Sequence, residues 1–236
     1  MDASGYVTLS RQSGLLSQMD TIANNIANAS TTGFRREGVV FSEYIKRAGD
    51  APSLSMGFGN TRVVDQLQGG LTQTGGAFDL AIEGDGFFLI DTPQGQQLTR
   101  SGAFTPSPDG TLVTDDGYHV LDGGGSAIFV PATAKTVSVA LDGTVSADGV
   151  PLAQVGLWQL TDPLSLKHEA GTRFTSSGVE PAAGARVMQG YLEDSNVDPL
   201  QEVASMIAVQ RAYELGQSFL DREDDRARNV IQTLGR

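Results

Sequence analysis

Apolar residues near the N-terminus recur at the spacing of a single helix face. Successive members of this stripe are 4, 3, 4 and 3 residues apart, which predicts a helix over residues 1–33. Gly33 follows the stripe and can end the helix in the left-handed conformation that glycine adopts easily. The opposite face is polar, so an isolated helix with this narrow stripe is marginal in water and needs a partner. The stripe consists of Leu15, Met19, Ile22, Ile26 and Ala29.

A second, longer helix is predicted within residues 191–236. It starts at Asp198 and Pro199, because Asp caps a helix well and Pro fits its first position. The residues that follow alternate at spacings of 3 and 4, which is the heptad seam of a coiled coil. Polar residues at seam positions lower the stability of a coiled coil, but they fix the register of the helices and the choice of partner helix. The seam consists of Val203, Met206, Gln210, Tyr213, Gln217, Leu220, Asp224, Ala227, Ile231 and Leu234, of which three are polar.

Between the two helical stretches, the pattern changes to short apolar runs separated by turn signals. Asp-Gly pairs are favoured in tight hairpin turns, because both central residues of a type I′ turn need positive φ. Short strands at regular spacing predict a β-rich domain over residues 69–190, built as a sandwich or a barrel. Residues 34–68 are expected to be an extended connector. The Asp-Gly pairs lie at 85–86, 109–110, 116–117, 122–123, 142–143 and 148–149.

The predicted fold class is therefore α+β. Long N- and C-terminal helices pair as a coiled-coil-like arm, and a central all-β domain lies between them. Two interpretations of the helices stay open: an intramolecular pair in a stable monomer, or a bundle shared by several subunits. The polar seam positions favour the bundle.

Charge and composition exclude several function classes. The chain has 236 residues and a formal net charge of −12, which disfavours binding to nucleic acid and to anionic membrane surfaces. It has no cysteine, so disulfides and thiolate zinc sites are excluded. No apolar run approaches the roughly 20 residues that span a bilayer. The N-terminus lacks the pattern of a Sec-type signal peptide, so we expect any export to use another route.

No catalytic, cofactor or metal residue is assigned, and we expect neither an enzyme nor a cofactor. His119 and His168 are far apart and show no metal-ligand spacing. The Gly-Asp-Gly at 84–86 begins like a dinucleotide-binding turn, but another strand follows it where that motif requires a helix. The Asp-Gly pairs lack the alternating carboxylates of a calcium loop, and turn formation explains them better. A hydrolase would require a clustered site that the sequence does not display.

Three groups of residues resemble one family. Residues 23–34 (Ala-Asn-Asn-Ile-Ala-Asn-Ala-Ser-Thr-Thr-Gly-Phe) resemble the N-terminal signature of bacterial flagellar rod and hook proteins. Residues 195–198 (Ser-Asn-Val-Asp) and 206–214 (Met-Ile-Ala-Val-Gln-Arg-Ala-Tyr-Glu) resemble the C-terminal signature. Residues 80–88 and 99–104 resemble the β-domain core. Only 43–68 and 122–190 match loosely.

The resemblance implies an axial subunit of the flagellar basal-body rod. Its terminal helices would line the inner tube, with the β domain outside. Partners would be other copies, neighbouring rod proteins and the flagellar type III export apparatus, with no nucleic acid and no membrane insertion. Within the family, residues 1–6 and 220–236 favour a proximal-rod protein over a distal-rod one. Contact with peptidoglycan is left open.

The expected assembly interface lies on the two terminal helices. Apolar stripe residues would be buried within and between subunits, and the asparagines would either hydrogen-bond between neighbouring helices or face solvent. In isolation we expect the helices to be frayed and to order on assembly. A different class, a secreted β-rich module that binds cell-wall glycan, is the alternative. The interface residues are Leu15, Met19, Ile22, Asn24, Asn25, Ile26, Asn28, Val203, Met206, Gln210, Tyr213, Gln217, Leu220 and Ile231.

Overall fold

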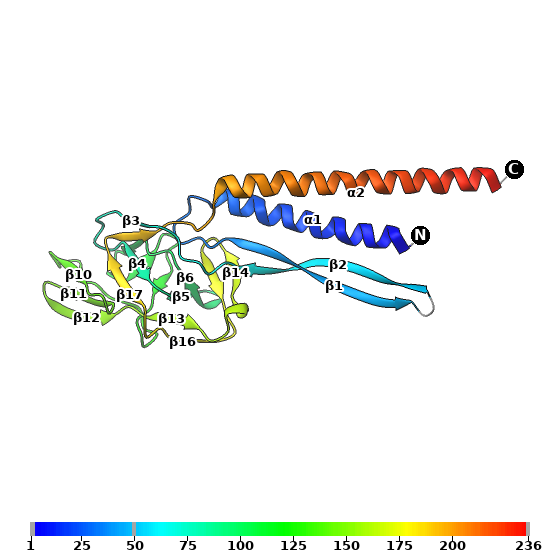
Figure 1. The fold of residues 1–236 in the computed structure, drawn as a ribbon. Helices are drawn as coiled ribbons and strands as arrows, with labels where there is room; N and C mark the ends of the chain where they lie inside the picture. The colour runs from blue at the N-terminus through cyan, green and yellow to red at the C-terminus, as the bar shows by residue number, and fades with distance from the viewer. Residues whose placement is uncertain (1–2, 49–50, 235–236) are drawn as a thin grey trace. The chain divides into compact units, whose positions relative to one another are not determined.

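A computed structural model describes the protein over residues 3–48 and 51–234 (Figure 1). Side chains are described in these ranges except at 3–6, 42–48, 51–60, 227, 231 and 234. The chain divides into two compact units. The helical unit comprises Met1–Ala27, Glu37–Val63 and Asp198–Arg236, and the β unit comprises Asn28–Arg36 and Val64–Val197.

Two helices lie side by side in the helical unit: α1 (Ala3–Ala27) and α2 (Pro199–Leu234) (Figure 1). The start of α2 follows its sequence signal, because the Asp198 carboxylate accepts hydrogen bonds from the backbone N–H groups of Leu200 and Gln201 at 2.9 and 3.3 Å. The chain after α1 turns at Gly33, whose φ is +71°. A β-carbon at this position would lie 2.3 Å from the backbone nitrogen of Ser101, so both conformation and space require glycine.

The predicted fold, in which the terminal helices pair as a coiled-coil-like arm, is wrong. A heptad seam buries its residues against the partner helix, but Val203, Gln210 and Gln217 of the predicted seam are exposed. Helix α1 packs instead on a neighbouring face of α2 that includes Val209. The structure has one N-terminal helix and one C-terminal helix flanking a central β-rich part.

The segment expected to be an extended connector contains two long strands. They are β1 (Glu37–Ala48) and β2 (Ala51–Val64), which pair in a two-stranded sheet (Figure 1). Most of both strands belongs to the helical unit, so this unit combines helices and a sheet. The sequence predicted an extended conformation for this segment, but not the pairing of β1 with β2.

The β unit is built on one nine-stranded sheet and three smaller ones. The large sheet follows the order β14-β15-β6-β5-β9-β8-β7, with β13 paired to both β5 and β16. Its strands are β5 (Phe87–Thr92), β6 (Gly95–Thr99), β7 (Phe104–Pro106), β8 (Leu112–Thr114), β9 (His119–Val120), β13 (Leu157–Leu160), β14 (Lys167–Ala170), β15 (Arg173–Thr175) and β16 (Val179–Pro181). A short 3₁₀ helix, η1 (Pro163–Ser165), precedes β14.

Of the three smaller sheets, one pairs consecutive strands, and two pair a strand near the end of the β unit with one near its beginning. One has the order β10-β11-β12, and the others are the pairs β17-β4 and β18-β3. Strand β18 therefore joins the end of the β unit to its beginning. The strands are β3 (Leu71–Gln73), β4 (Leu80–Glu83), β10 (Val137–Val139), β11 (Thr144–Ala147), β12 (Val150–Gln154), β17 (Arg186–Gln189) and β18 (Tyr191–Glu193).

Strand β5 explains why the β unit has two hydrophobic cores. Side chains alternate between the faces of a strand, and Phe88 and Ile90 point into one core, whereas Phe87 and Leu89 point into the other. All four side chains are buried. A strand covered on both faces reads as a continuous apolar run, as residues 87–90 do.

One Asp-Gly pair has the conformation that its sequence predicts. Asp148 and Gly149, between β11 and β12, have φ values of +50° and +81°. Positive φ at both central residues is what a type I′ turn requires. This turn sets the register of the two strands, in which Ala147 lies opposite Val150.

Candidate functional site

The facing sides of α1 and α2 form a small hydrophobic core. Leu15 and Ile22 of α1 and Val209 of α2 are buried at its centre. Five partly buried residues complete it: Met19, Ile26, Met206, Ala212 and Tyr213. The predicted α1 stripe is therefore the face that packs on α2, since four of its five members lie in this cluster.

A polar contact fixes the closest approach of the two helices. Gln12 is 5% exposed, and its Nε2 donates a hydrogen bond to the backbone oxygen of Tyr213 at 3.0 Å. A β-carbon on Gly216 would lie 2.3 Å from the same Nε2 atom. Gly216 therefore leaves the space that Gln12 fills. The Oε1 atom of Gln12 is buried without a hydrogen-bond partner among the described residues.

Asn25 connects three elements of the helical unit. Its Oδ1 accepts a hydrogen bond from the backbone N–H of Glu37 at 2.9 Å, and its Nδ2 donates to the backbone oxygen of the same residue at 2.8 Å. The Nδ2 atom also donates to Oε2 of Glu202 at 3.2 Å. All three residues are buried. Asn25 thereby fixes the end of α1 to the start of β1 and to the first turn of α2.

The expected interface residues whose side chains are described occupy four environments. Leu15, Met19, Ile22, Ile26, Met206 and Tyr213 meet in the α1–α2 core. Asn25 is buried in the polar junction just described, and Asn24, Asn28 and Leu220 are half-buried. The side chain of Ile231 lies outside the described residues. Val203, Gln210 and Gln217 are exposed.

Several residues of the helix pair were missed by the sequence reasoning. The buried residues Glu202 and Val209 and the half-buried Gly216 alternate with Met206 and Tyr213 at spacings of 4 and 3, which is also a heptad-like stripe. The predicted seam shares Met206 and Tyr213 with this stripe but lies on their other side. The sequence does not distinguish the two stripes, since Val209 is apolar where Gln210 is polar, but Glu202 is charged where Val203 is apolar.

Both helices also carry apolar residues that their shared core leaves exposed, and we call these residues the second apolar surface. A surface helix normally confines its apolar residues to one face, and a helix that is apolar on several faces is covered on several faces. Large exposed apolar patches mark interaction sites. The exposed apolar residues of the two helices are Leu9, Leu16, Leu200, Val203, Ile207, Leu215, Phe219 and Val230.

A groove runs beside the line of contact between α1 and α2. Its volume is about 390 Å³, and its floor contains Leu15, Gln12 and Gly216. Leu215 and Phe219, which are 73% and 43% exposed, lie on its α2 side. Burying an apolar side chain of this size is worth roughly 1.5–3 kcal/mol. The groove is thus an apolar surface, and another chain that covers it removes these side chains from water, which stabilises the association.

The C-terminal part of α2 extends beyond its pairing with α1. Gln12 contacts Tyr213 and Asn25 contacts Glu202, so the two helices run in opposite directions. The two contacts are 25 − 12 = 13 residues apart on α1 and 213 − 202 = 11 residues apart on α2. At the ordinary helical rise, the first described residue of α1 lies level with about residue 222 of α2. Residues 223–234 therefore project past the described part of α1.

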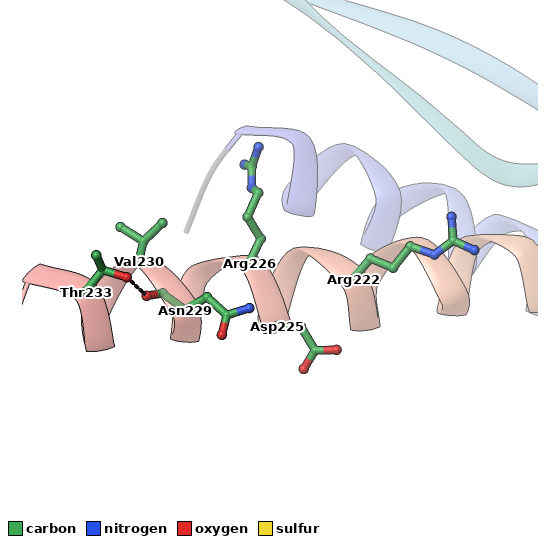
Figure 2. Close-up of a pocket in the computed structure, with 6 residues that line it drawn as sticks. All are labelled: Arg222, Asp225, Arg226, Asn229, Val230 and Thr233. Carbon is green, nitrogen blue, oxygen red and sulfur yellow. Dashed lines mark hydrogen bonds between the residues drawn. The ribbon is translucent and has the colours of Figure 1, made fainter.

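This projecting part of α2 is polar and open. A shallow hollow along it is lined by Arg222, Asp225, Arg226, Asn229, Val230 and Thr233 (Figure 2). Thr233 donates a hydrogen bond to the backbone oxygen of Asn229 at 2.7 Å, within the same helix. The ion pairs Arg226–Glu223 and Arg228–Asp224 (2.8 and 2.6 Å) are also internal to α2 and exposed, so each contributes little to stability.

In the β unit, a buried ionic cluster joins the segments that precede and follow the β structure. Arg35 Nη2 is 2.8 Å from Glu193 Oε1, and Arg100 Nη1 is 3.4 Å from Glu193 Oε2. All three side chains are at most 2% exposed. Burial lowers the pKa of the Arg100 guanidinium to about 10, and it lowers the pKa of Arg35, while Glu193 acts in the opposite direction on both.

Backbone hydrogen bonds strengthen the same junction. The Gly33 N–H donates to the backbone oxygen of Glu193 at 2.7 Å. Asn196 accepts from the Arg36 N–H at 2.6 Å and donates to the backbone oxygens of Asp65 and Leu67 at 3.2 and 2.8 Å. The Asn196 N–H also donates to the backbone oxygen of Phe34 at 3.4 Å, so parts of the two sequence signatures, 28–34 and 195–197, meet within the β unit.

Over 3–48 and 51–234, no group of three or more His, Asp or Glu side chains is placed to hold a metal ion. Within those ranges, no helix is long and apolar enough to cross a membrane. His119 lies on β9, and the His168 ring on β14 packs against the rings of Phe34 and Phe174 at 5.7 and 5.3 Å.

Three family models match the chain. Residues 6–35 match "Flagella basal body rod protein", residues 81–147 match "Flagellar hook protein FlgE/F/G D1 domain", and residues 188–233 match "Flagellar basal body rod FlgEFG protein C-terminal". The three matches occur in chain order. They cover α1 with the junction that follows it, the first part of the β unit, and α2.

Curated relatives match over nearly the full length. The flagellar basal-body rod protein FlgF of Caulobacter vibrioides is 38% identical, over 100% of this chain and 99% of its own. FlgF of Rhizobium meliloti is 36% identical, over 98% of this chain and 97% of its own. FlgG of Bacillus subtilis is 32% identical, over 97% of this chain and 96% of its own. This chain is thus more similar to these two FlgF proteins than to that FlgG.

Proposed function

The chain belongs to the family of flagellar basal-body rod proteins, and from that membership we propose that it assembles into the rod through the exposed apolar surface of α1 and α2. It is a structural subunit of the rod in the flagellar basal body, and its family is not a family of enzymes. The observation that carries the proposal is the second apolar surface of the helices. Each helix already buries one face in the chain itself, and further apolar residues remain exposed.

The partners that we propose are other copies of this chain and neighbouring rod proteins. Leu200, Val203 and Ile207 lie on a side of α2 that α1 does not cover, and Leu215 and Phe219 border the groove. A neighbouring helix that covers these residues removes apolar area from water, which is the main favourable term in protein association. The interface therefore combines residues expected from the sequence, such as Val203, with others that were not expected, such as Ile207 and Leu215.

Two further parts of the proposal rest on the family. We propose that the chain reaches the rod through the flagellar type III export apparatus. Its place is proposed to be that of FlgF in the proximal rod, because the FlgF relatives are 38% and 36% identical, against 32% for FlgG of Bacillus subtilis. The place of FlgG in the distal rod is the second candidate.

The experiment compares exposed apolar residues on the helices with an exposed apolar residue on the β unit. The double variant Leu215→Ser/Phe219→Ser changes the groove on the helices, and Leu164→Ser changes an 80% exposed leucine in η1 of the β unit. Each chain is produced in a strain that lacks its own copy, swimming is measured, and isolated basal bodies are probed for the chain.

We expect the unaltered chain and Leu164→Ser to restore swimming and to appear in basal bodies. The double variant should unfold at the same temperature as the unaltered protein, since both side chains are exposed, but should be absent from basal bodies. If the double variant builds rods normally, the helix surface is not the assembly surface. If the unaltered chain is absent from basal bodies, the proposed place of the protein is wrong as well.

A further inference from the structure

The Asp-Gly pairs of the β unit are positions at which the backbone can rearrange. The amide nitrogen of the glycine attacks the side-chain carboxyl carbon of the aspartate, because glycine has no side chain that blocks the approach. A C–N bond forms, the amide proton leaves with the carboxyl OH as water, and a succinimide ring results. A second water opens the ring at its other carbonyl group, which yields isoaspartate. The chain then runs through the side chain and is longer by a CH₂ group.

Hydrogen bonds hold five of the six Asp-Gly pairs away from the geometry of this attack. The reaction requires the nitrogen and the carboxyl carbon to be free to approach each other with the right orientation. In the pair at 148–149 the carboxylate is fixed, since Asp148 accepts a hydrogen bond from the backbone N–H of Thr136 at 3.0 Å. In four other pairs the glycine N–H donates to a backbone oxygen at 2.8 to 3.1 Å, and these glycines are Gly110, Gly117, Gly123 and Gly143.

The pair formed by Asp85 and Gly86, between β4 and β5, is not restrained in this way. Among the described residues, neither the Asp85 carboxylate nor the Gly86 N–H has a hydrogen-bond partner. Arg35 and Arg100 attract the carboxylate, but neither of these two residues forms an ion pair with it. The Asp85 side chain is exposed, and a cavity of about 230 Å³ beside the pair leaves room for the ring and for water.

We propose that Asp85 is the residue at which the folded β unit forms isoaspartate. The modification lies next to an anchored residue, because the Gly84 N–H donates to Oε1 of Gln68 at 3.2 Å and the Gly84 oxygen accepts from Nη2 of Arg100 at 2.7 Å. An additional CH₂ group in the following residue displaces these groups. Arg100 is buried, so the loss of an acceptor for its guanidinium group lowers the stability of the β unit.

Incubation of the full-length protein tests the proposal, with the other Asp-Gly pairs as internal controls. One sample is kept folded at neutral pH, and another is kept unfolded in urea for the same time. Peptides are then analysed by mass spectrometry with electron-transfer fragmentation, which distinguishes isoaspartate from aspartate. In the folded sample we expect isoaspartate to accumulate several-fold faster at Asp85 than at any other pair. In urea the rates at the six pairs should be similar, because the hydrogen bonds are lost.

The pair formed by Asp116 and Gly117 is the sharpest comparison in the folded sample. Both residues are exposed, but the Gly117 N–H donates to the backbone oxygen of Thr114 at 2.8 Å. If exposure alone sets the rate, Asp116 and Asp85 react equally fast. A rate at Asp116 that equals or exceeds the rate at Asp85 would therefore overturn the proposal.

Two matched variants keep the charge and change the reactivity. A glutamate closes a larger ring and reacts far more slowly than an aspartate, so Asp85→Glu should remove most of the isoaspartate from the folded protein. Asp116→Glu should leave the amount nearly unchanged. Urea unfolding after incubation measures the consequence: the unaltered protein and Asp116→Glu should lose stability with time, and Asp85→Glu should keep it. Equal losses in all three proteins would contradict a role of Asp85 in loosening the β unit.

Discussion

Among the described residues, Glu193 is the only carboxylate in direct ion-pair contact with Arg35 and Arg100. Replacing it by glutamine tests how much the cluster stabilises the β unit. Glu193→Gln keeps the size of the side chain but leaves two buried guanidinium groups without their anion. Breaking a buried ion pair by removing one partner costs about 3–5 kcal/mol. We expect a loss of this size in the free energy of unfolding, measured by urea denaturation.

The control for this prediction is Glu83→Gln, at the exposed end of β4. Surface substitutions of this kind change stability by less than about 0.5 kcal/mol. A Glu193→Gln variant as stable as the control would show that the cluster is not held by its charges.

Asp148 makes the stability of the β10-β11-β12 sheet sensitive to acid. The backbone N–H of Thr136 donates to its carboxylate at 3.0 Å, and this bond holds the pKa of Asp148 below the ordinary value of an aspartate. The folded state therefore binds this proton less readily than the unfolded state, so the stabilisation is complete above the unfolded pKa and is lost as pH falls through the folded one. We expect Asp148→Asn to be less stable than the unaltered protein at pH 7, with the difference shrinking below about pH 4.

Unfolding by urea at several pH values checks this dependence. Asp116→Asn, at an exposed turn position, provides a variant with the same change in net charge. If the difference between Asp148→Asn and the unaltered protein is the same at pH 3 and pH 7, the hydrogen bonds of this carboxylate do not stabilise the sheet.

Single residues differ in how much of their role the sequence reveals. Asp198 was identified as a helix cap because the capping signal lies within a few neighbouring residues. The partners of Glu193 could not be identified in this way, because Arg35 and Arg100 are 158 and 93 positions away in the chain. Asn25 is a similar case, since its partner Glu202 lies 177 positions away.

At the scale of elements, Leu15 and Leu16 separate stability from assembly. They are neighbours on α1, but Leu15 is 8% exposed in the core with α2, whereas Leu16 is 47% exposed. We expect Leu15→Ala to destabilise the helical unit by about 2–5 kcal/mol, as for other buried leucines. Leu16→Ala should leave unfolding nearly unchanged and weaken assembly.

Thermal unfolding and analytical ultracentrifugation measure the two effects on the same proteins. The prediction is contradicted if Leu16→Ala lowers the unfolding temperature as much as Leu15→Ala does. It is also contradicted if Leu16→Ala assembles as well as the unaltered chain.

The two helices also show why the buried face of α1 was predicted from the sequence and the buried face of α2 was not. On α1, Leu9 and Leu16 lie outside the stripe, but only the stripe repeats regularly over about four turns, so the sequence defines the buried face. On α2, apolar residues lie on several sides, and a stripe through Val203 and Gln210 has the same period as one through Glu202 and Val209. Periodicity alone cannot choose between them, because both faces gain from burial and only one of them faces α1.

Hydrogen exchange along α2 should report the extent of its pairing with α1. Residues 202–213 lie opposite α1 between its contacts at Gln12 and Asn25, whereas 223–234 project past it. Helices shorter than about 12–15 residues are marginal in water without tertiary contacts. In the isolated protein we expect amide protection in 202–213 and fast exchange in 223–234, measured by mass spectrometry. Full protection of 223–234 in a monomer would contradict this gradient. Protection of 202–213 alone would limit the expected fraying of the isolated helices to the part of α2 that projects past α1.

At the scale of the whole molecule, each unit is assembled from separate parts of the chain. The helical unit draws on three segments and the β unit on two. The sequence predicted a helix at each end and strands between them, because those signals are local. It did not predict that residues 28–36 belong with the β structure or that 37–63 belong with the helices. Such membership depends on contacts between distant residues, as in the hydrogen bond between Gly33 and Glu193.

Net charge sets the condition under which copies of the molecule can associate. At −12, the copies repel one another, while the exposed residues Leu9, Leu16, Ile207 and Leu215 supply an apolar attraction that salt does not weaken. The distance over which charges act falls from about 30 Å at 0.01 M salt to about 10 Å at 0.1 M. We therefore expect the fraction of oligomers, measured by light scattering at fixed protein concentration, to rise with sodium chloride over this range. Leu215→Ser should lower the fraction at every salt concentration. Oligomers that dissociate as salt is added would instead show that ion pairs between copies, and not apolar burial, hold the assembly together.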